Sequence, residues 1–122
     1  MLVNHTHFSC GKKMWKLDTE GAFIGFEKEL NSYYKSKKIK LASLDKIIIY
    51  TDGICEATNS NNEQYSIKRL QRAVLKNNSL SCNKLLESVI SDLSTFTHKA
   101  TRKDDETLII IEMKQLEKNS LA

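Results

Sequence analysis

Two acidic segments stand directly beside runs of β-branched residues, one at the end of a run and one at the start of another. Asp52 follows residues 46–50, KIIIY, and the pair Asp104 and Asp105 comes shortly before residues 107–113, TLIIIEM. If the two runs are neighbouring antiparallel strands, the end of the first lies beside the start of the second. The carboxylates of Asp52 and Asp104 would then meet at one rim of a sheet.

Two carboxylates at such a rim would favour a bound divalent cation. Ionised carboxylates held close together repel each other, which raises a pKa, and a bound cation removes that penalty. Oxygen ligands without imidazole or thiolate partners select the hard ions Mg²⁺ or Mn²⁺ over Zn²⁺. Gly53 would let the backbone approach the ion or supply a carbonyl ligand. The competing interpretation is an ordinary turn at Asp52 and a solvated loop at residues 104–105.

Three other groups of residues could carry chemistry, and each has a simpler interpretation. His5, His7 and Cys10 are zinc-ligand types, but strand alternation puts only the two histidines on one face. Cys55 could be a nucleophile, yet no histidine stands in a context that suggests a dyad, which favours a packed thiol. The lysines of residues 28–40 could contact phosphates, but no nucleic-acid motif accompanies them. We therefore expect no nucleic-acid partner.

The elements that must position the rim begin with a hairpin. Residues 3–10 and 14–17 flank Gly11, which can supply the positive φ of a tight turn. Residues 33–41 are interpreted as a polar-faced strand. The run at 46–50 is short and continuously apolar, which predicts a strand buried on both faces.

Two amphipathic helices are predicted between the two β-branched runs. The first covers residues 67–76, and the second starts after Ser81, which is a favourable N-cap residue. Their apolar positions recur at spacings of three and four and predict the apolar stripes: Ile67, Leu70, Val74 and Leu75 on the first, and Leu85, Leu86, Val89, Ile90, Leu93 and Phe96 on the second. The order of strands, two helices and a strand predicts an α+β fold with both helices on one face of a sheet.

Composition limits the class of protein. The chain has 122 residues, of which 40% are hydrophobic and 28% charged, values typical of one soluble globular domain. No apolar run approaches the roughly 18 residues of a membrane span. The first residues do not have the pattern of a signal peptide. Three cysteines without C-x-x-C spacing are typical of reduced thiols, so we expect a cytoplasmic protein.

The sequence around Asp52 resembles that of a known family. Residues 48–59, IIYTDGICEATN, are similar to the TDG-x-x-EA-x-N signature of the bacterial stage II sporulation protein E (SpoIIE) and sigma-factor-regulator branch of the PPM metal-dependent protein serine/threonine phosphatases. Four further segments resemble family motifs in the family's order: residues 4–7, NHTH, for Asn-Ala-Gly-His; 21–25, GAFIG, for G-x-P-L-G; 63–70, EQYSIKRL, for GE-x-FG-x-x-RL; and 104–108, DDETL, for the DD-x-T ending.

The resemblance implies a fold and a division of the chain. Members of the family are sandwiches of two antiparallel sheets flanked by helices. The matching motifs correspond to the C-terminal half of that sandwich, a sheet with two helices on one face. They assign residues 1–114 to a partial PPM/SpoIIE-type phosphatase domain and residues 115–122 to a tail. A half-sandwich would expose one sheet face, which suggests self-association through that face.

The resemblance also implies an activity: the chain would be a hydrolase, a protein phosphatase that acts in signal transduction. Two Mn²⁺ or Mg²⁺ ions would activate a water that hydrolyses phosphoserine or phosphothreonine without a covalent enzyme intermediate. Asp52 and Asp104 would be metal ligands, Gly53 and Asp105 would support them, and no catalytic residue is implied beyond the ligands. The substrate would be a phosphoprotein such as an anti-sigma-factor antagonist.

This sequence departs from the family pattern in its carboxylates. The family carries further metal-binding aspartates before the Asn-Ala-Gly-His strand, whereas this chain begins at that strand and no aspartate precedes Asp18. We therefore expect an incomplete domain that is weak or inactive alone. The alternative is a non-catalytic regulatory or interaction module derived from the phosphatase fold.

Overall fold

The computed structural model describes residues 12–17, 38–98, 100 and 104–114, together with the backbone course of residues 5–10. The G-x-P-L-G-like segment at 21–25, most of the lysine-rich segment and the tail at 115–122 lie outside the described residues.

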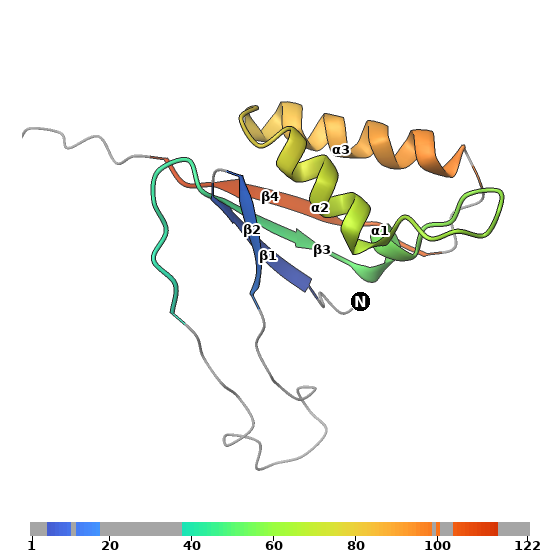
Figure 1. Ribbon diagram of the computed structural model, residues 1–122, viewed down its shortest axis with the longest axis horizontal. Coiled ribbons are helices and arrows are strands. Elements are labelled where there is room, and N and C mark those ends of the chain that lie inside the picture. The colour runs from blue at the N-terminus through green and yellow to red at the C-terminus, as the bar shows by residue number, and fades with distance from the viewer. Residues whose placement is uncertain (1–4, 11, 18–37, 99, 101–103, 115–122) are drawn as a thin grey trace, which may run out of the picture.

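Four strands form one antiparallel sheet. They are β1 (His5–Cys10), β2 (Lys13–Leu17), β3 (Lys46–Tyr50) and β4 (Leu108–Glu112), in the spatial order β2-β1-β3-β4 (Figure 1). The pairing of β1 with β2 confirms the predicted hairpin. The polar-faced strand predicted at residues 33–41 is not formed over residues 38–41, and its first part lies outside the described residues.

The two β-branched runs are neighbours, as predicted. β3 and β4 pair antiparallel, with Tyr50 opposite Leu108 at one end and Lys46 opposite Glu112 at the other. Strand pairing therefore brings the residues after β3 to the same edge as the residues before β4.

Between β3 and the first long helix lies a short helix that the sequence did not predict. Helix α1 (Asp52–Glu56) starts directly after β3, with Thr51 in an extended conformation at its N-cap position. The polar turn that follows is held by Asn59, whose side-chain oxygen accepts hydrogen bonds from the N–H groups of Asn61 at 2.9 Å and Glu63 at 3.0 Å. This is the behaviour expected of asparagine in turns.

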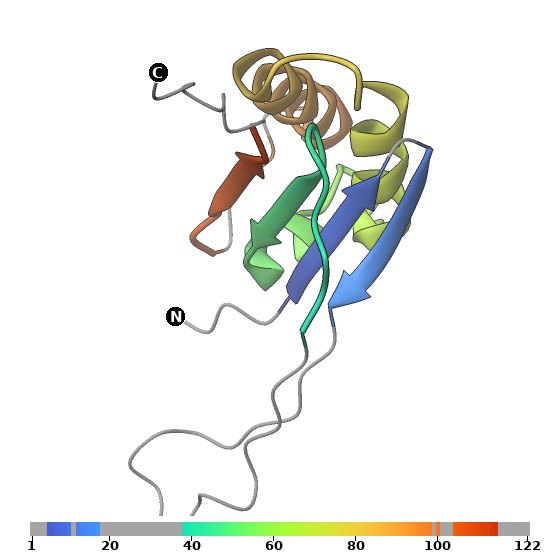
Figure 2. The ribbon, with the colours of Figure 1, turned by 90° about the vertical axis from the view of Figure 1, so that its left-hand side faces the viewer.

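Both predicted long helices are present and lie on one side of the sheet. They are α2 (Ser66–Lys76) and α3 (Cys82–Thr97), and Figures 1 and 2 show both above the same face. Ser81 occupies the N-cap position of α3, but its side chain makes no capping hydrogen bond. Its carbonyl oxygen instead accepts the first intrahelical bond, from the N–H of Leu85 at 2.8 Å.

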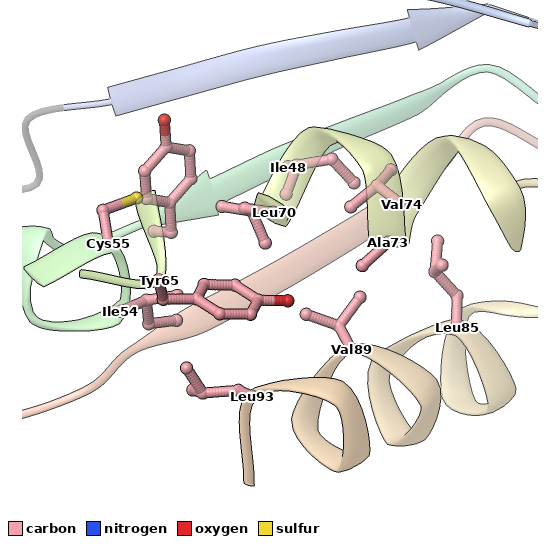
Figure 3. Packing of buried hydrophobic residues seen from close by; sticks show 11 residues of the cluster. Ile48, Ile54, Cys55, Tyr65, Leu70, Ala73, Val74, Leu85, Val89 and Leu93 are labelled. Atoms are coloured by element: carbon pink, nitrogen blue, oxygen red, sulfur yellow. The ribbon is translucent and has the colours of Figure 1, made fainter. Parts of the chain in front are cut away.

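The core lies between the helices and the sheet, where side chains of β3, α2 and α3 meet (Figure 3). The predicted stripes are confirmed at the fully or nearly fully buried positions Leu70, Val74, Leu85, Val89 and Leu93. The prediction was wrong for Ile90, which is 50% exposed. Four further members of the stripes are only half-buried: Ile67, Leu75, Leu86 and Phe96. Ile90 follows Val89 by one residue, about 100° around the helix, and so points off the core-facing stripe.

The prediction that β3 is buried on both faces was also wrong. Ile48 and Tyr50 are fully buried, whereas Ile47 and Ile49, which alternate with them, are half-buried. The reason is that α2 and α3 cover only one face, and no helix or strand of the described residues covers the other (Figure 2).

Among the described residues, no helix combines the length and the apolar content that crossing a bilayer requires.

Candidate functional site

The rim of the sheet is formed where β3 ends and β4 begins. Tyr50 is the last residue of β3 and pairs with Leu108, the first residue of β4. Asp52 opens α1 immediately after that point, and residues 104–107 lead into β4 from the same side (Figure 1). The predicted meeting of the two acidic segments at one rim is therefore confirmed at the level of the backbone.

Thr51 fastens the two segments to each other. Its backbone N–H donates to the carbonyl oxygen of Thr107 at 3.1 Å, and its hydroxyl oxygen accepts from the N–H of Thr107 at 3.0 Å. The same hydroxyl donates to the carbonyl oxygen of Asp105 at 3.3 Å. Thr51 is only 4% exposed, so these bonds are largely shielded from water. Sequence reasoning missed this role, although Thr51 stands inside the TDG signature.

Gly53 is the position where the two segments come closest. A β-carbon there would overlap the carbonyl oxygen of Asp105, and it would lie 3.1 Å from the carbonyl carbon of Asp105 and 3.7 Å from the β-carbon of Asp104. The glycine is thus required for space. The predicted role of Gly53 beside a metal ion stays a prediction; the contact present is with the backbone of the second acidic segment.

The acidic side chains differ in their exposure. Asp104 and Asp105 are exposed and Asp52 is half-buried. The N–H of Asp105 donates to Oδ1 of Asp104 at 2.8 Å, which restricts the Asp104 carboxylate. One carboxylate thus belongs to the first turn of α1, and two belong to the loop that packs against it.

The electrostatic field of the rim is negative. Burial raises the pKa of the Cys55 thiol from 9.0 to about 12, and the nearby charges of Asp52 and Glu56 add to the shift. Burial also raises the pKa of Tyr50, with smaller contributions from Cys55 and Asp52. Both groups are therefore neutral at pH 7. Cys55 behaves as the packed thiol favoured above, because a nucleophilic cysteine needs a lowered pKa.

The rim offers oxygen ligands of the kind that hard cations bind, but it offers few of them. Carboxylate and carbonyl oxygens suit Mn²⁺ and Mg²⁺. Within the described part of the chain, no three side chains among His, Cys, Asp and Glu are grouped closely enough to hold a metal ion. The assignment of Asp52 and Asp104 as metal ligands therefore stays a prediction. Two such carboxylates suit one ion that keeps part of its hydration shell.

The residues proposed and set aside as a zinc site are separated by the strand register. His5 pairs with Tyr50 and His7 with Ile48, which places both histidine positions on the helix-covered face. Cys10 has the opposite parity along β1. The side chains of these residues lie outside the described part of the structure.

A groove of about 270 Å³ lies next to the rim, between α3 and the start of β4. It is lined by Ile54, Leu86, Val89, Ile90, Leu93, Ser94, Thr97, Glu106 and Leu108. A phosphoryl group needs cations or several hydrogen-bond donors, whereas this lining is mainly apolar and carries one acid. The groove does not fit a phosphoryl site.

Comparisons with known proteins show the family through a family model and the fold through solved structures. The family model described as stage II sporulation protein E (SpoIIE) matches residues 5–114. The SiaA-PP2C domain of Pseudomonas aeruginosa superposes with a TM-score of 0.74 at 14% identity, over 90% of this chain and 43% of that one. The phosphatase domain of the cell fate determinant SpoIIE from Bacillus subtilis, in a crystal form without domain swapping, gives 0.63 at 17% identity, over 98% and 50%.

A further structure of the Bacillus subtilis SpoIIE phosphatase domain gives a TM-score of 0.59 at 16% identity, over 92% of this chain and 49% of that one. Comparison with curated protein sequences gave no match. This chain therefore spans about half the length of the solved structures that it matches.

Proposed function

Because the chain belongs to the stage II sporulation protein E family, whose members are phosphatases of PP2C-like fold, we propose that it carries the Asp52–Asp104 rim of a metal-dependent protein serine/threonine phosphatase. The observation that carries the proposal is the packing of Gly53 against the Asp104–Asp105 backbone, which brings the two acidic segments together.

Each residue of the rim has a proposed task. Asp52 and Asp104 hold a Mn²⁺ or Mg²⁺ ion, and Thr51 and Gly53 keep their backbones at a fixed separation. Asp105 restrains the Asp104 carboxylate through its N–H. Such preorganisation matters because a site that is loose by about 1 Å loses much of its function. When bound, the ion supplies Lewis acidity and lowers the pKa of a coordinated water.

The substrate class follows from the family. We propose a phosphoserine or phosphothreonine on a protein such as an anti-sigma-factor antagonist, an assignment that rests on family analogy. The proposed setting is the cytoplasm, which is supported by the free thiols of Cys55 and Cys82.

We further propose that the 122-residue chain alone binds Mn²⁺ weakly and hydrolyses phosphoesters at background rates. Two aspartates at one rim can hold one ion whose other positions are filled by water. A two-metal site needs more ligands, because a second cation close by must overcome the repulsion of the first. Activity would then require carboxylates beyond those at this rim.

The test is a calorimetric titration with Mn²⁺ beside hydrolysis of p-nitrophenyl phosphate. Asp52→Asn removes a carboxylate charge that attracts the cation and should weaken Mn²⁺ binding by about tenfold or more, since losing even a residue that supports a ligand costs roughly 10–100-fold in metal affinity. The matched control Glu87→Gln removes the same charge from an exposed position on α3 and should leave binding unchanged. Equal affinities in all three proteins would overturn the rim as a metal site. Vigorous Mn²⁺-dependent hydrolysis by the wild-type chain would overturn the incomplete-site argument.

A second candidate is a non-catalytic interaction module built on the same fold. It is favoured by the finding that the described residues offer no group of three metal-capable side chains. The titration separates the two candidates, since a module without a metal role predicts that Asp52→Asn and Glu87→Gln behave alike.

A further inference from the structure

Helix α2 presents a row of positive charges to solvent. Four of its 11 residues are cationic, none is acidic, and all four cations are exposed. We call them the basic stripe: Lys68, Arg69, Arg72 and Lys76. At about 100° per residue they fall within an arc of roughly 100° on the helix. The other side of α2 enters the core (Figure 3) through Leu70, Ala73 and Val74. The stripe therefore points away from the sheet, and a layer packed on the far face of the sheet would not cover it.

The basic stripe works against the stability of the helix that carries it. Like charges four residues apart on a helix repel each other, and the stripe contains two such pairs, Lys68 with Arg72 and Arg72 with Lys76. Lys68 and Arg69 also stand in the first turn, where the helix macrodipole disfavours cations. Of the four residues, Lys76 stands in the last turn, where a cation is favoured. Natural sequences accept such local conflicts mainly at functional sites.

The described part of the chain does not neutralise the basic stripe. Three of its members form no ion pair with any described residue: Lys68, Arg72 and Lys76. The guanidinium carbon of Arg69 lies 4.5 Å from the centre of the Phe96 ring, a cation–π contact that holds the side chain and leaves N–H donors for another ligand. Asp92, on the neighbouring helix α3, accepts a hydrogen bond from the Tyr65 hydroxyl at 2.6 Å. Its single charge can offset at most one of the four cations.

We infer that the basic stripe is a docking surface for an acidic segment of a partner protein. Lys68, Arg72 and Lys76 follow one another at about 6 Å along the helix axis, because each residue rises by about 1.5 Å. An extended segment with a carboxylate at every second residue repeats at about 7 Å, so its carboxylates can lie against these three cations. Bound carboxylates remove the repulsion within the stripe, and Arg69 can bind one of them through two parallel hydrogen bonds. This inference goes beyond the proposed function and does not depend on it.

The surroundings of the basic stripe favour a protein over a membrane or a nucleic acid. Helices that bind membrane surfaces insert their apolar face into the lipid, whereas the apolar face of α2 is buried in the core. Sites for single-stranded nucleic acid combine cations with aromatic rings on which bases stack. The ring beside the stripe, that of Phe96, is half-buried and in contact with Arg69. Charge complementarity without a lipid-facing or stacking surface fits an acidic polypeptide.

The test is fluorescence anisotropy with a labelled decapeptide of alternating Glu and Gly, titrated with the intact chain. The salt concentration is about 0.1 M, at which charges more than about 10 Å apart are largely screened from each other. The double variant Lys68→Gln/Arg72→Gln should bind the peptide about fivefold more weakly, because two exposed ion pairs are lost. The matched control Lys38→Gln/Lys40→Gln removes the same charge from exposed positions outside α2 and should change the affinity by less than about twofold.

The single variant Lys76→Gln, at the end of the helix, serves if the double variant does not fold, and it should weaken binding by about twofold. Equal affinities of the wild type and the Lys68→Gln/Arg72→Gln variant overturn the inference. A decapeptide of alternating Gln and Gly that binds as tightly as the acidic one overturns it as well. Decauridine and vesicles of anionic phospholipid are the competing ligands. If either binds more tightly than the acidic peptide and loses affinity in the same double variant, the stripe is not a protein-docking surface.

Discussion

At one end of the β3–β4 strand pair an ammonium group and a carboxylate form an ion pair, while at the other end the acidic residues of two segments lie near the surface. The Lys46 ammonium lies 2.8 Å from Oε2 of Glu112 and donates to the carbonyl oxygen of Asn78 at 2.9 Å. Lys46 is 3% exposed and Glu112 21%. At the rim, Gly53 packs against the Asp104–Asp105 backbone, and the hydrogen bonds of Thr51 tie the two segments together.

The two ends of this strand pair differ in what they contribute: the Lys46–Glu112 end stabilises the fold, and the rim carries the proposed functional site. The Lys46–Glu112 end is neutral as a pair and joins β3, β4 and the α2–α3 connection. The rim places acidic residues of two segments side by side, an arrangement that like-charge repulsion opposes and a bound cation would favour. Functional sites often contain such local conflicts, and the rest of the fold compensates for them.

The largest change in stability should come from the Lys46–Glu112 end of the strand pair. Glu112→Ala leaves the Lys46 ammonium buried, with the Asn78 carbonyl as its remaining partner within the described part of the chain, and breaking a buried ion pair costs about 3–5 kcal/mol. Because Glu112 keeps some access to water, we expect a loss near about 3 kcal/mol in urea unfolding. The double variant Lys46→Met/Glu112→Leu should recover most of it, since an apolar pair of similar volume is often neutral. A loss below about 1 kcal/mol for Glu112→Ala, the size of a surface ion pair, would remove the contrast between the two ends.

An intermediate effect is expected at the rim itself. Gly53→Ala forces the Asp105 carbonyl away from α1, and overpacking of this kind costs about 1–3 kcal/mol. Thermal unfolding followed by circular dichroism measures the loss. Ser60→Ala, which changes a side chain by a similar amount in an exposed turn, should leave the unfolding temperature unchanged. If Gly53→Ala were as stable as the wild type, the two acidic segments would not be packed together.

The smallest expected effect is a gain in the stability of the folded chain. In the presence of a chelator, Asp104→Asn should stabilise the chain by about 0.5 kcal/mol or less, because it removes one of the mutually repelling charges at an exposed position. Asparagine keeps the side-chain oxygen that accepts from the Asp105 N–H. The gain should shrink as salt screens the repulsion, and it should reverse when Mn²⁺ is added. Destabilisation without metal would contradict the view of the rim as a charged site awaiting a cation.

The position of the rim was predictable because strand pairing leaves little freedom. Once KIIIY and TLIIIEM are recognised as adjacent antiparallel strands, Asp52 and Asp104 must lie at one edge. Helix α1 was not predictable, because five residues contain too little of the helical period to be distinguished from a turn. The hydrogen bonds of Thr51 depend on contacts between segments far apart in sequence, and local patterns do not contain them.

The errors on burial have a common origin. The apolar side chains of Ile47, Ile49 and Ile90 favour burial, but their hydrophobicity does not show whether another layer is present to cover them. The sequence therefore predicted burial on both faces of β3, and the structure leaves one face open.

The strand order β2-β1-β3-β4 also governs how the chain can fold. The β1–β2 hairpin and the α2–α3 pair form from residues close in sequence, but the central strand β3 must find β1 across β2 and the residues that follow it, and β4 across α1, α2 and α3. Closing such loops costs entropy before any contact repays it, so proteins dominated by these pairings fold in about milliseconds to seconds. During that interval KIIIY and LIIIE are unpaired, and short β-branched segments of this kind aggregate readily. The amount of native protein recovered from a cell should therefore depend on how quickly β3 acquires both neighbours, and lower temperature or slower synthesis should increase it more than added stability of the folded state.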